Sequence, residues 1–203
     1  MPLVNYSARE ITCKIVYYGP GRSGKTTNLQ HLHAHVPEHQ RGEMVSLATE
    51  GDRTLFFDFL PLDLGTISGF RVRLQLYTVP GQVYYDATRK LVLQGADGVV
   101  FVADSRPAQH EENVESFRNL HVNLLAQGVD PRTVPLCLQY NKRDLDDVMP
   151  LEAMDAALNF RALPRFAASA TRGEGVFETL HGVSELVLRA VEQQLVASAG
   201  GAR

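Results

Sequence analysis

One short segment constrains this chain more than any other: a glycine-rich turn that joins an apolar stretch to a helical one. Residues 11–18 form the apolar stretch and favour a buried strand, and a helical pattern runs from about residue 24 to residue 36. The turn between them, Gly19-Pro-Gly-Arg-Ser-Gly-Lys-Thr26, matches the pattern GxxxxGK[ST]. A strand, this turn and a helix in direct succession predict an α/β domain built around a bound polyphosphate.

The residue types of this turn fit that chemistry. Glycines allow backbone N–H groups to curl around phosphate oxygens, and the start of the following helix adds a partial positive charge. Lys25 supplies a full charge between the β- and γ-phosphates, while the Thr26 hydroxyl is a hard oxygen ligand for Mg²⁺. The residues expected to bind the phosphates are Gly19, Gly21, Arg22, Ser23, Gly24, Lys25, Thr26 and Thr27.

The rest of the chain alternates strand-like and helix-like segments, which is typical of a mostly parallel sheet covered by helices. Residues 70–77 alternate apolar and polar side chains, and residues 53–64 before them are also extended. Because the link 65–69 is short and flanked by glycine, these two strands are expected to form an antiparallel hairpin at one end of the sheet. Buried parallel strands are expected at 99–103 and 134–140, and helices at 84–94, 114–124 and 176–191.

Length and composition narrow the class of protein. The 203 residues fit one domain, expected at 1–195, followed by a small, glycine-containing tail at 196–203 that is expected to be disordered. A formal net charge of −3 offers no positive field for nucleic acid, so no nucleic-acid partner is expected. The apolar runs are too short to span a membrane and neither end carries a lipidation pattern, so we expect a cytoplasmic protein with no direct membrane anchor. Cys13 and Cys137 lie within apolar runs and are expected to be buried thiols.

A second motif follows the strand expected at 134–140. Asn141-Lys-Arg-Asp144 begins where that strand ends, at the carboxyl edge of the sheet, where ligands bind in open α/β folds. A carboxylate there accepts two hydrogen bonds from guanine, from the ring N–H and the exocyclic amine, which adenine does not present together. Asn141, Lys142 and Asp144 are therefore predicted to bind guanine. The backbone of Ser169 and Ala170 can reach the base oxygen.

Two further segments fit the sensing of a third phosphate. Thr78-Val-Pro-Gly-Gln82 ends the alternating strand, where the Gly81 N–H can bind a γ-phosphate and Gln82 can orient an attacking water. Thr54, in the extended segment before it, is the candidate for a second hydroxyl ligand of Mg²⁺. The predicted metal ligands are thus Thr26 and Thr54, and the predicted bound molecules are GTP or GDP with Mg²⁺.

This ordered set of motifs resembles that of Ras-like small GTPases. Four stretches, 14–21, 49–61, 77–82 and 139–144, more narrowly resemble the bacterial MglA family of mutual gliding GTPases, and the resemblance covers about residues 1–195. It implies a P-loop small-GTPase fold: a mostly parallel six-stranded sheet with one antiparallel strand and helices on both faces. It also implies a slow GTPase that acts as a cytosolic polarity switch in motility, is recruited to a cell pole through partners and signals to downstream effectors. The activator would be a homodimeric, roadblock-domain protein of MglB type.

Two positions bear on the metal and on catalysis. Thr78 stands where most small GTPases have an aspartate, and this neutral hydroxyl, which MglA-like proteins share, predicts weaker retention of Mg²⁺. Arg53, directly before Thr54, is a candidate arginine finger that a partner aligns, a role worth about 10³–10⁵ in rate when the guanidinium is correctly placed. The alternative for Arg53 is a solvated side chain on a loop. The predicted catalytic residues are Gln82 and Arg53.

Other features leave alternatives open. His31 and His35 lie four apart on one helical face, a spacing that can bind zinc, but no third ligand stands at metal spacing. The aromatic residues within 55–59 and 83–85 fit either the core or a partner surface beside the two phosphate-sensing segments. A nucleotide kinase shares the fold and the phosphate loop but needs a basic lid, which the segment around Pro150 does not offer. The remaining alternative is a module that binds nucleotide without hydrolysing it.

Overall fold

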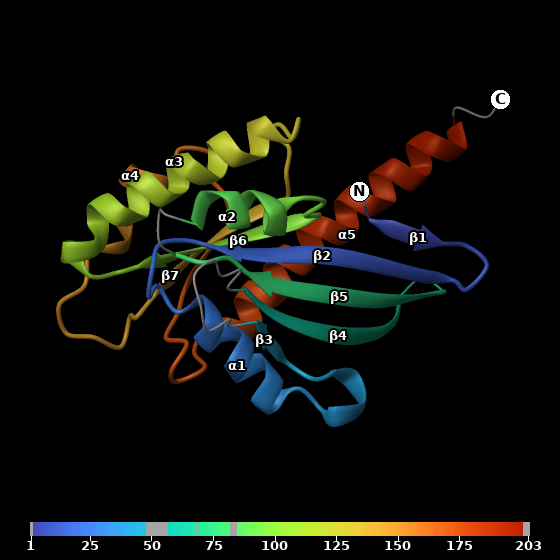
Figure 1. The fold of residues 1–203 in the computed structure, drawn as a ribbon, viewed down its shortest axis with the longest axis horizontal. Coiled ribbons are helices and arrows are strands. Elements are labelled where there is room, and N and C mark those ends of the chain that lie inside the picture. Colours follow the sequence, from blue (N-terminus) through green and yellow to red (C-terminus); the bar gives the residue numbers. More distant parts are fainter. Residues whose placement is uncertain (1, 48–56, 68, 82–84, 201–203) are drawn as a thin grey trace.

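A computed structural model of the chain describes residues 2–47, 57–67, 69–81 and 85–200. Within these ranges the strands form one sheet in the order β3-β4-β5-β2-β6-β7-β8, with β1 paired to β2 (Figure 1). The strands are β1 (Leu3–Asn5), β2 (Glu10–Tyr18), β3 (Val45–Leu47), β4 (Phe57–Ile67), β5 (Phe70–Thr78), β6 (Gly98–Asp104), β7 (Leu136–Asn141) and β8 (Arg165–Ala167). The helices are α1 (Lys25–His35), α2 (Asp86–Leu93), α3 (His110–Ala126), α4 (Leu151–Leu158) and α5 (Val176–Gly200), with 3₁₀ turns η1 (Glu38–Gln40) and η3 (Pro107–Gln109).

The strand pairing confirms the predicted fold class. Strands β5, β2, β6, β7 and β8 are parallel to one another, and β4 pairs antiparallel with β5, as expected for the hairpin. Two three-residue strands, β1 and β3, extend the sheet beyond the six predicted strands, and both pair antiparallel. A strand of three residues is too short for its alternation to be recognised in a sequence. As a result β3, and not β4 as expected, is the edge strand at this end of the sheet.

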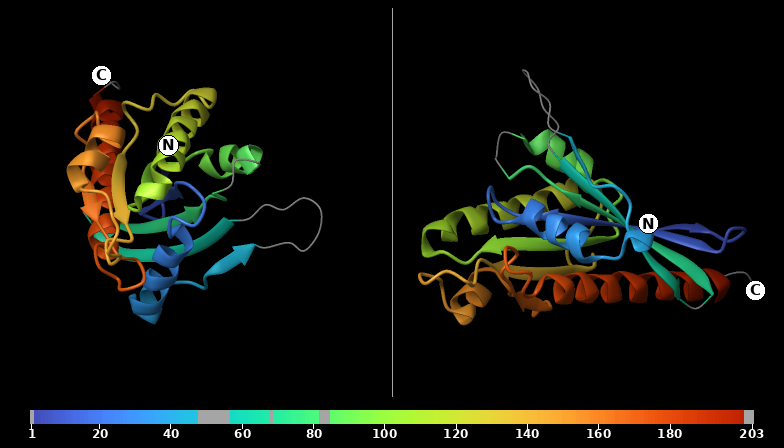
Figure 2. Two further views of the ribbon diagram at one scale, coloured as in Figure 1. Left: turned by 90° about the vertical axis from the view of Figure 1, so that its left-hand side faces the viewer. Right: turned by 90° about the horizontal axis from the view of Figure 1, so that it is seen from below.

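Helices lie on both faces of the sheet, as Figure 2 shows. On one face, apolar side chains of α1 and α5 pack against inward residues of β2, β4 and β5. On the other face, α2, α3 and α4 pack against β6, β7 and the end of β2. Strand β6 is buried at all seven positions, which explains its continuous apolar sequence, whereas β5 buries Val72, Leu74 and Leu76 and exposes Arg71 and Arg73.

Parallel pairing brings the carboxyl ends of five strands to one edge of the sheet. Strand β2 ends at Tyr18, β5 at Thr78, β6 at Asp104, β7 at Asn141 and β8 at Ala167. The predicted phosphate loop, the segment from Thr78 to Gln82, which we call the third motif, and the segment from Asn141 to Asp144, which we call the base motif, each begin at one of these ends. This edge is therefore where segments that are far apart in the sequence meet.

The structure bears on several smaller expectations. Helix α5 continues to Gly200, through most of the segment expected to be a disordered tail, and the domain boundary at residue 195 stays a prediction (Figure 2).

Cys13 and Cys137 are buried free thiols, and burial, aided by the charge of Asp97, raises the pKa of Cys13 to about 12. Over the described ranges, no helix is both long enough and apolar enough to cross a bilayer.

The histidines of α1 show no sign of a metal site. His31 and His35 stack with ring centroids 4.0 Å apart, and the His35 ring contacts the His31 carbonyl oxygen through Nδ1 at 2.9 Å. Among the residues that the structure describes, no group of three or more histidine, cysteine, aspartate or glutamate side chains is placed to hold a metal ion. The pair therefore packs against itself at the C-terminal end of α1.

Candidate functional site

The phosphate loop runs from the end of β2 to the first residue of α1 and packs against the base motif. Gly24, the residue before α1, has φ +99°, and a Cβ there would lie 2.2 Å from Asn141 Nδ2. Asn141 occupies that space and donates from Nδ2 to the Ser23 carbonyl oxygen at 2.7 Å. Glycine is thus required at position 24 both for its backbone conformation and for the close approach of Asn141.

Lys25 is buried beneath the loop. Its Nζ donates to the carbonyl oxygens of Gly19, at 3.0 Å, and Pro20, at 2.6 Å. Burial, together with the charge of the nearby Arg89 guanidinium, lowers the pKa of Lys25 to about 7. An ammonium group held in a positive, water-poor environment gains more from a phosphate than an exposed lysine would.

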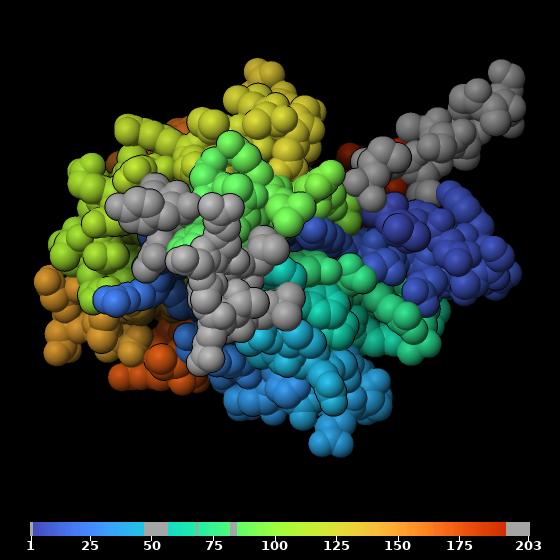
Figure 3. All heavy atoms as spheres, in the orientation of Figure 1, coloured from blue at the N-terminus to red at the C-terminus, as the bar shows by residue number. Residues whose placement is uncertain are grey.

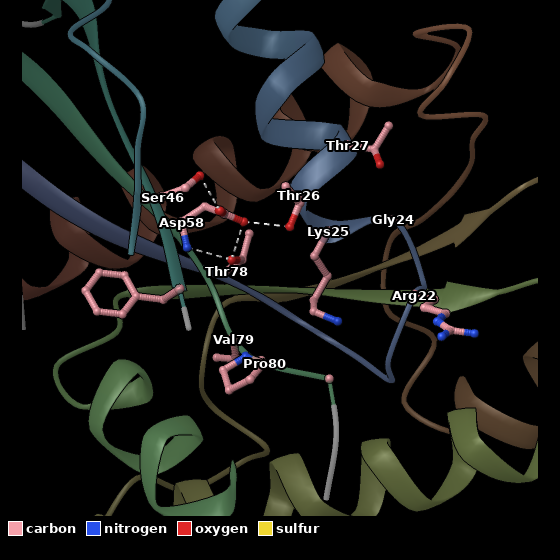
Figure 4. A pocket seen from close by; sticks show the side chains of 12 residues that line it. Arg22, Gly24, Lys25, Thr26, Thr27, Ser46, Asp58, Thr78, Val79 and Pro80 are labelled. Atoms are coloured by element: carbon pink, nitrogen blue, oxygen red, sulfur yellow. Dashed lines mark hydrogen bonds between the residues drawn. The ribbon is translucent and has the colours of Figure 1, made fainter. Parts of the chain in front are cut away.

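A carboxylate from β4 joins the phosphate loop to the third motif, as Figure 4 shows. Asp58 Oδ2 accepts hydrogen bonds from Thr26 Oγ1 at 2.6 Å and from Thr78 Oγ1 at 2.8 Å. Its Oδ1 accepts one from Ser46 Oγ at 2.8 Å, and its backbone N–H donates to Thr78 Oγ1 at 2.9 Å. Asp58 carries no signal of this role in the sequence, because β4 has the pattern of an ordinary apolar strand and only its pairing with β5 brings the carboxylate to Thr78.

These groups fit a magnesium ion by their chemistry. Mg²⁺ prefers hard oxygen ligands, and a carboxylate with three hydroxyls gathered around it supplies such oxygens beside the lysine that would hold the phosphates. The expectation of weak Mg²⁺ retention rested on the missing carboxylate at position 78. Asp58 supplies a carboxylate at the same place from a different strand, so that reason no longer holds.

The third motif lies directly against the phosphate loop. A Cβ on Gly81 would come 2.2 Å from the Cα atom of Gly21, so only glycine permits this approach. Gly81 and Lys25 line the same cavity of about 470 Å³, together with Thr26, Asp58 and Thr78. The structure thus brings the predicted γ-phosphate sensor and the predicted phosphate-binding lysine to one space.

A second cavity, of about 170 Å³, lies on the base-motif side of the loop. It is lined by Asn141, Lys142, Asp144 and Ala170 from the predicted set, and by Leu145 and Thr171, which belong to no sequence motif. The Ala170 N–H donates to Asn141 Oδ1 at 2.9 Å, which ties the Ser169-Ala170 turn to the base motif. Arg22, Gly24 and Thr27 line this cavity and the larger one alike.

Neighbouring side chains keep the carboxyl groups at the base motif ionised. A hydrogen bond from the Ser169 side chain is the main reason that the pKa of Asp144 lies below its usual value, so this carboxyl is ionised at neutral pH. Lys142 has φ +67° and its Nζ lies 2.7 Å from Oδ2 of the buried Asp104. Burial alone would raise the pKa of Asp104, but hydrogen bonds from Arg106 and Lys142 outweigh it and keep the carboxyl ionised.

A buried polar network supports the phosphate loop from beneath, and sequence reasoning missed it as well. Asn28 Nδ2 donates to the Gly24 carbonyl oxygen at 2.9 Å and to Gln139 Oε1 at 2.8 Å. Gln139 Nε2 in turn donates to Asn28 Oδ1 and to Thr179 Oγ1, both at 2.9 Å. Three elements, α1, β7 and α5, therefore fix the end of the loop. A lone Asn and Gln within apolar segments give no pattern that would reveal this.

An aromatic patch borders the site on the outer face of the hairpin. We call Phe57, Phe59 and Tyr77 the aromatic patch: the Tyr77 centroid lies 5.9 Å from that of Phe57 and 4.9 Å from that of Phe59. All three side chains are half-buried, and Phe57 and Tyr77 also pack against the core under α2. Figure 3 shows the hairpin and α2 beside each other on one face of the molecule. The patch contributes to the core and still leaves aromatic surface accessible.

Three predicted residues fall outside the described part of the chain. Arg53 and Thr54 lie within 48–56, and Gln82 lies within 82–84. Their expected roles as arginine finger, metal ligand and water-orienting residue therefore stay predictions. The other predicted site residues lie at the carboxyl edge of the sheet, in or beside the two cavities.

The chain is strongly similar to a known protein. No family model matches the chain. The mutual gliding-motility protein MglA of Myxococcus xanthus (strain DK1622) is 57% identical over 188 residues, which cover 93% of this chain and 96% of that protein. The Ypt/Rab-type GTPase ypt7 of Schizosaccharomyces pombe is 27% identical over 149 residues, 71% of this chain and 72% of that protein. The Ras-related protein rab-39 of Caenorhabditis elegans is 23% identical over 194 residues, 94% of this chain and 77% of that protein.

Proposed function

This chain belongs to the MglA family of Ras-like small GTPases, and from that premise we propose that it is a Mg²⁺-dependent switch that controls cell polarity and gliding motility. Its membership makes it a GTPase that binds GTP and GDP. One observation carries the assignment of the site: the two cavities share Arg22, Gly24 and Thr27, so one nucleotide can place its phosphates in the larger cavity and its base in the smaller.

In this proposal each part of the site has a separate task. The loop from Gly19 to Thr27 and the Lys25 ammonium bind the phosphates, and the ionised Asp144 accepts the two guanine N–H donors. Thr26 and Asp58 would hold Mg²⁺ with Thr54, and the bound ion would neutralise charge on the β- and γ-phosphates. The Gly81 N–H would bind the γ-phosphate. Loss of the γ-phosphate on hydrolysis would then release the third motif, whose conformation would report the state of the nucleotide.

Hydrolysis is proposed to be slow without a partner. Gln82 would orient the water that attacks the γ-phosphorus, with GDP and inorganic phosphate as products. Arg53 would stabilise charge on the transferred group only when a partner aligns it, which is why the intrinsic rate would be low. The partner we propose is a homodimeric roadblock-domain activator of MglB type. The chain itself would be cytoplasmic and recruited to a cell pole through partners, and downstream effectors would read its GTP state.

The aromatic patch supports partner binding beside the switch segments. Phe57 and Tyr77 lie on strands that border the phosphate cavity, and Phe57 lines that cavity itself. Half-buried aromatic side chains supply large contact areas at little entropic cost, and they are enriched at protein interfaces. A surface that adjoins the γ-phosphate sensor can differ between the GTP and GDP states, as a switch requires.

The test begins with nucleotide preference and ends with turnover. We expect guanine nucleotides to co-purify with the chain and to bind far more tightly than adenine nucleotides. In single-turnover assays, adding the MglB-type protein should accelerate hydrolysis, and Gln82→Leu and Arg53→Ala should each abolish that acceleration while nucleotide binding is retained. Preference for ATP, or equal treatment of di- and triphosphate, would refute the switch. Intact stimulation in Arg53→Ala would place the arginine finger elsewhere.

A further inference from the structure

A buried arginine in α2 holds the backbone of the third motif. Arg89 is only 2% exposed, and its Nε donates to the Pro80 carbonyl oxygen at 2.9 Å while its Nη2 donates to the Gly81 carbonyl oxygen. Its Nη1 donates to Asn119 Oδ1 on α3 at 2.9 Å. Arginine is almost never fully buried unless it is paired, so these contacts need an explanation.

The acceptors of Arg89 are all neutral. They include two backbone carbonyls and one side-chain amide, and no ion pair of Arg89 with a carboxylate occurs among the described residues. The guanidinium also lies over the Tyr18 ring, 5.7 Å from its centroid, at the end of the strand that leads into the phosphate loop. A buried charge without a counter-charge is costly, and an anionic γ-phosphate next to Gly81 would lower that cost.

The contact with Pro80 fixes one peptide plane. The peptide bonds of the described chain are trans, so the Pro80 C=O and the Gly81 N–H point in opposite directions from the same plane. Because the C=O is bonded to Arg89, the Gly81 N–H is turned away from α2. Gly81 also lies against Gly21 of the phosphate loop and lines the cavity that contains Lys25.

We propose that Arg89 is a positioning residue for GTP recognition: by holding the Pro80 and Gly81 carbonyls, it presents the Gly81 N–H to the γ-phosphate. The proposal rests on the proposed function and deepens it, because it names the group that prepares the γ-phosphate sensor. A diphosphate makes no use of this N–H. Arg89 therefore contributes to the preference for GTP over GDP and much less to nucleotide binding in general.

A purely structural role makes a different prediction. Asn119 accepts from Arg89 and donates to Asp86 Oδ1 at 2.9 Å, so it anchors α2 to α3 without touching Pro80 or Gly81. If Arg89 acts only as part of this anchor, replacing either residue will lower the melting temperature and weaken both nucleotides alike. Asn119→Ala is thus the matched control for Arg89→Met, which removes the charge and keeps much of the volume.

The first measurement is the ratio of the affinities for a non-hydrolysable GTP analogue and for GDP. We expect Arg89→Met to reduce this ratio about tenfold or more, the usual scale for one lost hydrogen bond to a charged group, with GDP affinity nearly unchanged. Arg89→Lys keeps the charge but lacks the planar set of guanidinium donors, so its affinity ratio should lie between those of the wild type and Arg89→Met. Asn119→Ala should keep the wild-type ratio even though its melting temperature falls.

The second measurement observes the peptide itself. The chain contains two Pro-Gly pairs, Pro20-Gly21 in the phosphate loop and Pro80-Gly81 in the third motif. Labelling proline at its carbonyl carbon with ¹³C and glycine with ¹⁵N therefore isolates two amide resonances in a carbonyl-filtered spectrum. Exchanging GDP for the GTP analogue should shift the Gly81 amide downfield in the wild type and in Asn119→Ala, but not in Arg89→Met.

The outcomes separate the inference from the function on which it rests. A wild-type chain that does not distinguish the GTP analogue from GDP would contradict the proposed switch itself. A wild-type preference that Arg89→Met retains, with an unchanged Gly81 shift, would overturn the positioning role alone. Equal losses for both nucleotides in Arg89→Met and Asn119→Ala would show that Arg89 serves only the packing of α2 on α3.

Discussion

Asp58 Oδ2 accepts a 2.6 Å hydrogen bond from Thr26 Oγ1, although the two residues lie 32 positions apart and belong to different elements. The same oxygen accepts from Thr78, the residue that stands where most small GTPases have an aspartate. The carboxylate that position 78 lacks is therefore present at the site, carried by β4 instead of β5. This exchange is the main revision that the structure makes to the site expected from the sequence.

Replacing Asp58 should weaken the hold on Mg²⁺. We expect Asp58→Asn to release bound GDP at least about tenfold faster in the presence of Mg²⁺, because a charged oxygen beside Thr26 is lost. Chelation should accelerate release from the wild type but add little in the variant. Asp63→Asn, which removes a carboxylate from the same strand far from the cavity, is the control and should leave release unchanged. Equal effects of chelation on wild type and Asp58→Asn would contradict the role.

Replacing Asp144 should change the base that is recognised. Asp144→Asn offers one donor and one acceptor where the carboxylate offers two acceptors, so the guanine amine loses its partner. We expect GTP affinity to fall by about 100-fold or more, the scale of one or two lost hydrogen bonds to a charged group. Xanthosine triphosphate, whose oxygen replaces that amine, should bind the variant better than GTP does. Competition with labelled nucleotide measures both affinities, and unchanged GTP binding would rule out Asp144 as the base-reading residue.

Nucleotide affinity should depend on pH through Lys25. The pKa of Lys25 is lowered to about 7 in the nucleotide-free protein, and bound phosphates would raise it, so binding above neutral pH requires uptake of a proton. Affinity for GTP should therefore fall between about pH 7 and about pH 9, by at most about tenfold per pH unit. Calorimetry in buffers of different ionisation enthalpy measures the proton uptake. Lys25→Arg stays charged and should lose this uptake; the same uptake in that variant would assign it to another group.

The network beneath the loop should contribute to both stability and binding. Asn28→Ala leaves the buried Gln139 Oε1 without its donor, which costs about 1–3 kcal/mol of unfolding free energy, while Gln139 Nε2 keeps its bond to Thr179. It also removes the side-chain hydrogen bond to the Gly24 carbonyl oxygen, which then accepts only from the backbone N–H of residue 28, so nucleotide release should accelerate. Urea denaturation and a release assay measure the two effects. Gln30→Ala, at an exposed position of the same helix, should change neither; if the two variants behave alike, the network has no such role.

The local parts of this protein could be predicted from its sequence because their signals are short. A strand, a glycine-rich turn and a helix around Lys25 follow from neighbouring residues, and so do the alternating strand at 70–77 and the base motif that starts at Asn141. Each pattern reflects a backbone conformation or a chemistry that only a few residue types allow. The parallel sheet follows from the order of these patterns, and it brings their carboxyl ends to one edge.

What the sequence by itself determined is the set of groups predicted to meet the nucleotide, since phosphate and guanine each demand particular residue types at fixed spacing. Only the tertiary structure decided how those groups are supported. Asp58 reaches Thr26 through the pairing of β4 with β5, Arg89 reaches Pro80 from the next helix, and Asn28 meets Gln139 across the core. Such contacts join residues that share no local sequence pattern. The hydrogen bonds stabilise the protein only after folding has brought the partners together and removed water from around them.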